Sequence, residues 1–138
     1  MYLIDTNVIS ECRKRDRANK GVRLFFEEAS SNDSFLCLSV ITIGELRRGV
    51  ELIRHRGDTR QANQLEKWLT TIVEDYDDRI LNFTSDDAQL WGRLRVPRYE
   101  NAIDKQIAAT ALSNDLTLVT RNISDFDGFG IRLINPFL

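Results

Sequence analysis

Acidic and amide side chains stand at the ends of several apolar segments, and their types and spacing suit metal chemistry. Asp5 ends the first apolar segment, and Asn122 with Asp125 follows a later one. Glu45 and Asp104 stand near the starts of two expected helices. Carboxylate and amide oxygens are the ligands that Mg²⁺ and Mn²⁺ prefer. Several carboxylates around such an ion, with water and phosphate oxygens completing the shell, form the arrangement used for phosphodiester hydrolysis.

Each of these residues also has a purely structural interpretation. Asp5 can cap a loop, and Glu45 can be the reciprocal partner of Thr42 in a capping box. Asp104 can stabilise the positive end of a helix dipole, and Asn122 and Asp125 can be ordinary turn residues. Clustered carboxylates raise one another's pKa unless a cation intervenes, although helix amino termini soften the repulsion. Convergence of all these side chains at one place is what favours a metal site.

Apolar patterning predicts five strands that alternate with helices. The strands are expected at residues 1–4, 35–39, 80–83, 116–120 and 131–134. This alternation is typical of βαβ units, whose right-handed crossovers build a parallel sheet. In open α/β sheets, ligands bind beyond the carboxyl ends of the strands. The sequence therefore predicts one α/β domain over residues 1–138, with the acids at one edge of its sheet.

Caps and apolar stripes predict the helices between these strands. Thr6 or Asn7 is expected to cap a first helix that begins at Val8, and a helical hairpin is expected after the second strand. The acidic segment 74–78 is interpreted as a linker, and Ile103 is expected to face inward on the last helix.

Composition narrows the choice of metal and partner. The formal net charge of −2 argues against a domain held to nucleic acid by bulk charge alone. With two cysteines and one histidine, a thiolate or imidazole site is not expected, which leaves oxygen-bound Mg²⁺ or Mn²⁺. Cys12 and Cys37 are expected to be reduced thiols in a cytoplasmic protein, because no signal peptide precedes them. No apolar run approaches the length of a membrane span.

Two further groups of residues have a functional and a simpler interpretation. Trp68 and Trp91 lie on apolar stripes, so a place in the core or a dimer interface is favoured over base stacking. Five arginines of the expected hairpin can form a surface that contacts RNA, although a solvated helical face is the simpler interpretation. They are Arg47, Arg48, Arg54, Arg56 and Arg60.

Four blocks of the sequence resemble, in order and spacing, those of PIN-domain ribonucleases. They are LIDTNVISE at 3–11, SVITIGELRRG at 39–49, DKQIAATA at 104–111, and a closing block of VTRN at 119–122, DF at 125–126 and INPF at 134–137. The likeness covers essentially the whole chain and is nearest to VapC-type toxins of toxin–antitoxin pairs, particularly the FitB-like group.

The resemblance implies a three-layer α/β/α sandwich around a mainly parallel five-stranded sheet, usually a homodimer. It implies Mg²⁺- or Mn²⁺-dependent endonucleolytic cleavage of RNA, with growth arrest when the toxin is free. It also implies a cognate VapB- or FitA-like antitoxin whose tail occupies the groove of the active site.

By position, the resemblance assigns the catalytic and metal-binding acids. Asp5, Glu45 and Asp104 match the family's acidic triad, and Asn122 stands where the fourth residue is often Asp. The Asn122 carbonyl can still bind a cation, and Asp125 can supply the missing charge. Supporting hydrogen bonds are expected from Thr6, Asn7 and Thr120.

Other functions at such a sheet edge fit the residues less well. A phosphoacceptor receiver domain needs adjacent acids after its first strand, whereas Thr6 follows Asp5. A haloacid-dehalogenase-like phosphatase needs an acid where Asn7 stands. A catalytically silent interaction module of the same fold is the main alternative, and metal binding distinguishes it from an enzyme.

Overall fold

The computed structural model describes residues 1–138, and five short parallel strands form its central sheet. The strand order is β3-β2-β1-β4-β5. The strands are β1 (Tyr2–Ile4), β2 (Leu36–Ser39), β3 (Ile80–Leu81), β4 (Thr117–Val119) and β5 (Leu133–Ile134). Parallel pairing sets Leu3 of β1 beside Cys37 on one side and Leu118 on the other. The predicted parallel sheet is confirmed, with strands shorter than the apolar segments suggested.

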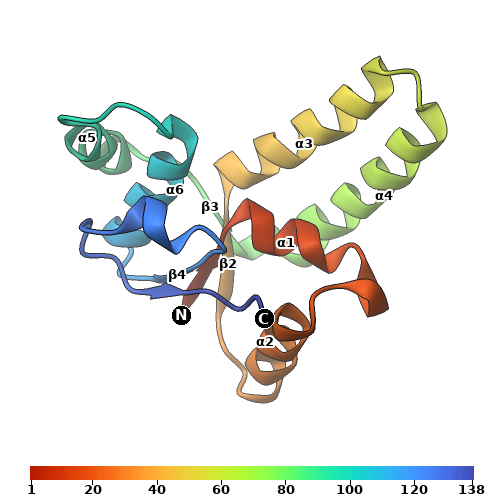
Figure 1. Ribbon diagram of the computed structural model, residues 1–138, viewed down its shortest axis with the longest axis horizontal. Coiled ribbons are helices and arrows are strands. Elements are labelled where there is room, and N and C mark those ends of the chain that lie inside the picture. Colours follow the sequence, from red (N-terminus) through yellow and green to blue (C-terminus); the bar gives the residue numbers. More distant parts are fainter.

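Six helices connect the strands (Figure 1). They are α1 (Thr6–Cys12) and α2 (Lys20–Ser31) after β1, α3 (Val40–His55) and α4 (Thr59–Asp75) after β2, and α5 (Ser85–Leu94) and α6 (Ala102–Ser113) after β3. Short 3₁₀ segments occupy Arg15–Arg17, Asp77–Arg79 and Ile123–Phe126. The expected helical hairpin is α3–α4, which projects from the sheet in Figure 1. None of the helices combines the length and apolar character needed to cross a membrane.

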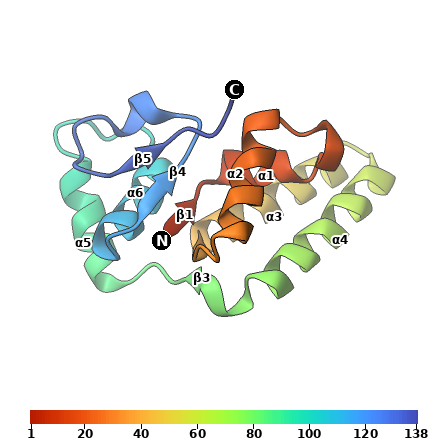
Figure 2. The same ribbon diagram turned by 90° about the horizontal axis from the view of Figure 1, so that it is seen from below.

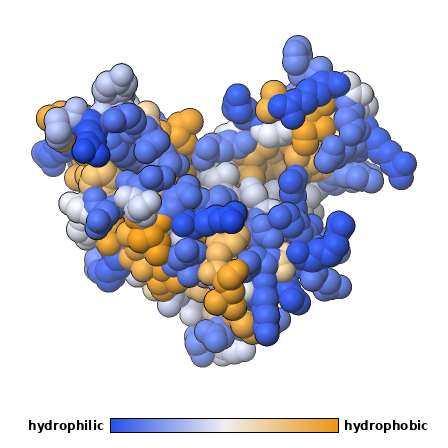
Figure 3. All heavy atoms as spheres, viewed as in Figure 1, coloured by the Kyte–Doolittle hydropathy of each residue, from blue (hydrophilic) through white to orange (hydrophobic).

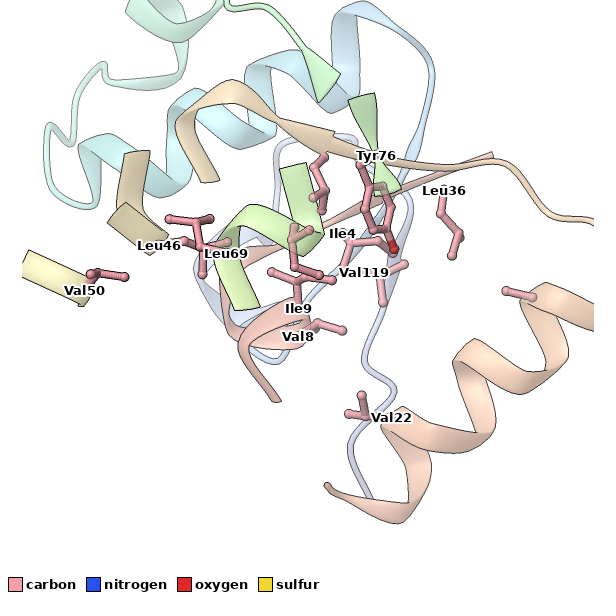
Figure 4. Packing of buried hydrophobic residues seen from close by; sticks show 13 residues of the cluster. Ile4, Val8, Ile9, Val22, Leu36, Leu46, Val50, Leu69, Tyr76 and Val119 are labelled. Carbon is pink, nitrogen blue, oxygen red and sulfur yellow. The ribbon is translucent and has the colours of Figure 1, made fainter. Parts of the chain in front are cut away.

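Each face of the sheet has its own apolar core, because successive strand residues point to opposite faces. Ile4 and Val119 pack with residues of α1 to α4, including Val8 and Leu69 (Figure 4). Leu3 and its neighbours pack on the other face, mainly against α6. Figure 2 shows α5 and α6 on one side of the sheet and α1 to α4 on the other. The predicted α/β/α sandwich is therefore confirmed.

The helix after β2 begins earlier than expected. Ser39 is its N-cap, and the Ser39 hydroxyl accepts a hydrogen bond from the backbone N–H of Ile41 at 3.0 Å. The expected capping box between Thr42 and Glu45 is wrong, since both residues lie inside the helix. The earlier cap leaves both of these side chains free for contacts outside α3.

Two expectations about packing are also wrong. Segment 74–78 is not a linker, because α4 continues to Asp75 and the Tyr76 side chain extends its apolar stripe into the core, where it is 8% exposed. Ile103 is exposed rather than inward-facing. It lies in the first turn of α6, one turn before Ile107, which is the residue that packs against the sheet.

Candidate active site

The sheet topology explains why acids far apart in sequence meet at one edge. The chain begins in the central strand β1, adds β2 and β3 on one side, and then returns to add β4 and β5 on the other. A reversal of this kind opens a crevice at the carboxyl ends of the strands, where α/β sheets bind ligands. Asp5 follows β1 directly, and the segment with Asn122 and Asp125 follows β4. Asp104 lies in the first turn of α6, the helix that leads into β4.

Asp5 is a buried carboxylate that caps α1. The helix begins at Thr6 rather than Val8, so the expectation that Thr6 or Asn7 supplies the cap is wrong. Because β1 ends at Ile4, Asp5 takes the N-cap position itself, and its Oδ1 accepts a hydrogen bond from Thr6 N at 2.8 Å. The side chain is 2% exposed. Burial raises the pKa of Asp5, hydrogen bonds to the carboxylate oppose the rise, and the nearby charge of Glu45 adds to it.

Two side chains hold the second oxygen of Asp5. Thr120 Oγ1 donates to Asp5 Oδ2 at 2.7 Å, and Asn7 Nδ2 donates to the same oxygen at 3.3 Å. The Thr120 hydroxyl in turn accepts a hydrogen bond from Asn122 N at 3.1 Å. Asn7 Oδ1 accepts one from Arg121 N at 3.2 Å. The end of β1 and the loop after β4 are thus tied together through Asp5.

Thr6 connects Asp5 to the acid on α3. Its hydroxyl donates to Glu45 Oε1 at 2.7 Å and lies 3.0 Å from the hydroxyl of Thr42. Thr42 is fully buried, and its place beside Thr6 was missed because its sequence pattern indicated a capping box. The earlier start of α3 is what turns Thr42 and Glu45 toward β1. Hydrogen bonding by Thr6 is therefore observed, and its role in catalysis stays a prediction.

Asp104 is a partly buried carboxylate under the influence of two others. Burial, then the charges of Asp5 and Asp125, raise its pKa from 3.8 to about 6. Asn122 and Asp125 are exposed in the segment after β4. The charges of Asp5 and Asp125 therefore raise the pKa of Asp104, and the charge of Glu45 raises the pKa of Asp5.

The chemistry of these donors fits a hard divalent cation. All are oxygen ligands, and a cation would offset both the burial and the repulsion that raise the pKa of Asp5 and Asp104. As the side chains stand, no three of the acids lie close enough together to hold one ion. Shared coordination therefore requires side-chain rotation, most simply of Asp104, because hydrogen bonds hold both Asp5 and Glu45.

The surface is hollowed between the α5–α6 lobe and the α3–α4 hairpin (Figure 3). A groove of about 290 Å³ runs between α1, α3 and α4 and begins at Thr6 and Glu45. Of the hairpin arginines, Arg56 lines this groove. Arg47 and Arg54 instead form exposed ion pairs with glutamates of α3 and α4.

Comparison with known proteins identifies the family. The PIN domain family model matches residues 2–129. The chain is 33% identical to Toxin FitB of Neisseria gonorrhoeae over 99% of both chains. It is 31% identical to VapC ribonuclease Y4jK of Sinorhizobium fredii over 99% of this chain and 98% of that protein. The crystal structure of FitAcB from Neisseria gonorrhoeae matches with a TM-score of 0.84 and 33% identity, covering 99% of this chain and 98% of that chain. The chain therefore belongs to the PIN domain family.

Proposed function

We propose that the protein is a metal-dependent endoribonuclease and the toxin of a toxin–antitoxin pair. The observation that supports the proposal is the place of Asp5 at the switch point of a PIN-domain sheet, where the charge of Glu45 acts on Asp5 and the charge of Asp5 acts on Asp104. The relatives named as a toxin and as a ribonuclease support the same assignment.

In this proposal the three acids hold Mg²⁺ or Mn²⁺, and Asn122 or Asp125 completes the site. An ion bound there supplies an activated water and stabilises negative charge on the phosphoryl oxygens. Asp5 is the fixed ligand, because the backbone N–H of Thr6 at the start of α1 and the hydroxyl of Thr120 determine the position of its carboxylate. Thr6 orients Glu45 from the other side.

Protonation couples to metal binding at this site. Without a cation, burial and like charges raise the pKa of Asp104 to about 6. A bound cation favours the ionised carboxylate, so metal affinity should increase as the pH rises through about 6.

We also propose a VapB- or FitA-like antitoxin and a homodimer, acting in the cytoplasm. The groove that begins at Thr6 and Glu45 has an apolar wall that includes Leu65 and Trp68, which suits side chains of an antitoxin peptide. Val96, Tyr99 and Ile103 are exposed apolar residues around the start of α6, which supports an interface between copies. Both cysteines are unpaired, in keeping with a reducing compartment.

The test is cleavage of RNA by the purified protein. We expect fragments from total RNA in the presence of Mg²⁺ or Mn²⁺, and none with EDTA or with Asp5→Asn. Asp16→Asn is a matched control, because Asp16 is an exposed acid in a 3₁₀ segment away from the sheet edge. Cleavage that survives both EDTA and Asp5→Asn contradicts the proposal. Mapping of the cut ends identifies the RNA.

A further inference from the structure

A second cavity adjoins the acidic edge on the side of α6. It has a volume of about 430 Å³ and lies between the loop that precedes α6 and the segment that follows β4. Asp125 belongs to its wall and also contributes to the raised pKa of Asp104. Lys105, the next residue along α6, lines the same cavity. A molecule in this cavity would therefore lie directly beside the acids.

Lys105 is an unusual wall residue, because its charge is buried without an ion pair. It is 5% exposed, and Nζ donates one hydrogen bond, to the backbone oxygen of Arg98 at 2.6 Å. The ring of Phe129 lies 5.9 Å from Nζ. The ammonium has three N–H donors, and no carboxylate forms a salt bridge with it. Buried charges are ordinarily paired, so the free donors indicate a ligand that supplies acceptors.

The rest of the wall identifies the kind of ligand. Glu100, Asp125 and Asp127 provide acceptors, and they outnumber the cations Lys105 and Arg98. A phosphate would be repelled by this excess of carboxylates. Apolar surface comes from the side chains of Leu94, Val96, Pro97 and Phe129. Donors, acceptors and an apolar wall together are what a splayed-out nucleobase requires.

We propose that this cavity receives a nucleobase of the RNA, next to the phosphate that is cleaved, and that it selects guanine. Guanine presents O6 and N7 as acceptors for a lysine, and its N1–H and amino group can donate to a carboxylate. Glu100 and Asp127 lie outside the acids assigned to the metal, so these two carboxylates are the acceptors available for this role. Lys105 is then a specificity-determining residue. The inference rests on the proposed ribonuclease function.

The test measures base preference by binding, so that it does not depend on cleavage. Uridine hexamers with a single guanosine, adenosine or cytidine are titrated into the Asp104→Asn protein and followed by fluorescence anisotropy. We expect the guanosine hexamer to bind about tenfold more tightly than the others. Adding Lys105→Met should reduce this preference to about twofold or less. Lys67→Met, an exposed lysine of α4, is the control and should leave it unchanged.

A second variant protects the test against misfolding of Lys105→Met. Asp127 is exposed, so Asp127→Asn should keep the fold and still weaken the guanosine preference. Equal affinity for all hexamers, no measurable binding, or a preference that survives both variants overturns the inference. These results are distinguishable from failure of the ribonuclease proposal. If the wild-type protein cuts RNA and the Asp104→Asn protein binds all hexamers equally, the nuclease proposal stands and the base site is overturned. If the Asp104→Asn protein prefers the guanosine hexamer and the wild-type protein does not cut RNA, the base site stands and the nuclease proposal fails.

Discussion

Replacement of Asp104 by asparagine should stabilise the metal-free protein, although it removes a proposed metal ligand. Asp104 is held beside Asp5 and Asp125, and their charges together with burial raise its pKa from 3.8 to about 6. The ionised carboxylate is therefore less favourable in the folded protein than in the unfolded chain. Asparagine has nearly the same shape and no charge, so it avoids this cost.

The size of the effect follows from the pKa shift. A shift of about two units corresponds to about 3 kcal/mol, at about 1.36 kcal/mol per unit. Asp104 is partly exposed, and solvent screening reduces the expected gain in the free energy of unfolding to about 1–2 kcal/mol.

The pH dependence of the gain has a definite sign. Because the folded-state pKa of Asp104 is the higher one, the folded protein binds this proton more tightly than the unfolded chain. Protonated Asp104 therefore stabilises the wild-type protein at low pH, and this contribution is lost as the pH rises from about 4 through about 6. The advantage of Asp104→Asn should be full at pH 7.5 and close to zero at pH 4.

Urea unfolding in EDTA, followed by circular dichroism at both pH values, measures this difference. Asp16→Asn serves as the control and should change the free energy of unfolding by less than about 0.5 kcal/mol. Mg²⁺ should then stabilise the wild-type protein more than the Asp104→Asn variant. A loss of stability in Asp104→Asn at pH 7.5, or a gain of the same size at pH 4, would refute the reasoning.

Three other substitutions test close packing of the chain and the hydrogen bonding of Asp5. Gly21→Ala should lower the free energy of unfolding by about 1–3 kcal/mol, because its Cβ would lie 2.0 Å from the backbone oxygen of Pro136. Gly49 lies in α3 with open space around it, so Gly49→Ala should leave the free energy of unfolding unchanged or raise it by up to about 1 kcal/mol. Equal urea midpoints for the two glycine variants would contradict this account. Thr120→Val should cost about 1.5–3 kcal/mol and raise the pKa of Asp5 further, because it removes the 2.7 Å hydrogen bond to the carboxylate. An Asp5 pKa that is unchanged in an NMR titration of this variant would argue against that role for Thr120.

The fold could be predicted because its signals are repeated along the chain. Leu3 and Ile4 are both apolar and lie on opposite faces of the sheet, and the other central strands show the same two-sided burial. Strands buried on both faces require helices on both faces, and alternation with helices requires parallel pairing. The position of Asp5 at the carboxyl end of β1 followed directly from this reasoning.

Local details of the site were less predictable, because they depend on contacts between distant segments. The Thr42–Glu45 spacing satisfies a capping-box pattern, yet Ser39 at the end of β2 caps the helix first. The hydrogen bond from Thr6 to Glu45 joins residues that are far apart in sequence.

Nothing in the sequence indicated that Lys105 is buried. A lysine in the first turn of a helix is ordinarily solvated, and its burial is set by the neighbouring loop and by Phe129 from the segment after β4.

Binding of Mn²⁺ tests the central claim most directly, namely that the acids at this sheet edge hold a divalent cation. The measurement is an electron paramagnetic resonance titration of Mn²⁺ with the purified protein at pH 7.5. We predict that the wild-type protein and Asp16→Asn bind Mn²⁺ equally, and that Glu45→Gln and Asp104→Asn each weaken binding about tenfold or more. Absence of binding, or binding that neither variant weakens, would contradict the metal site and favour a silent interaction module.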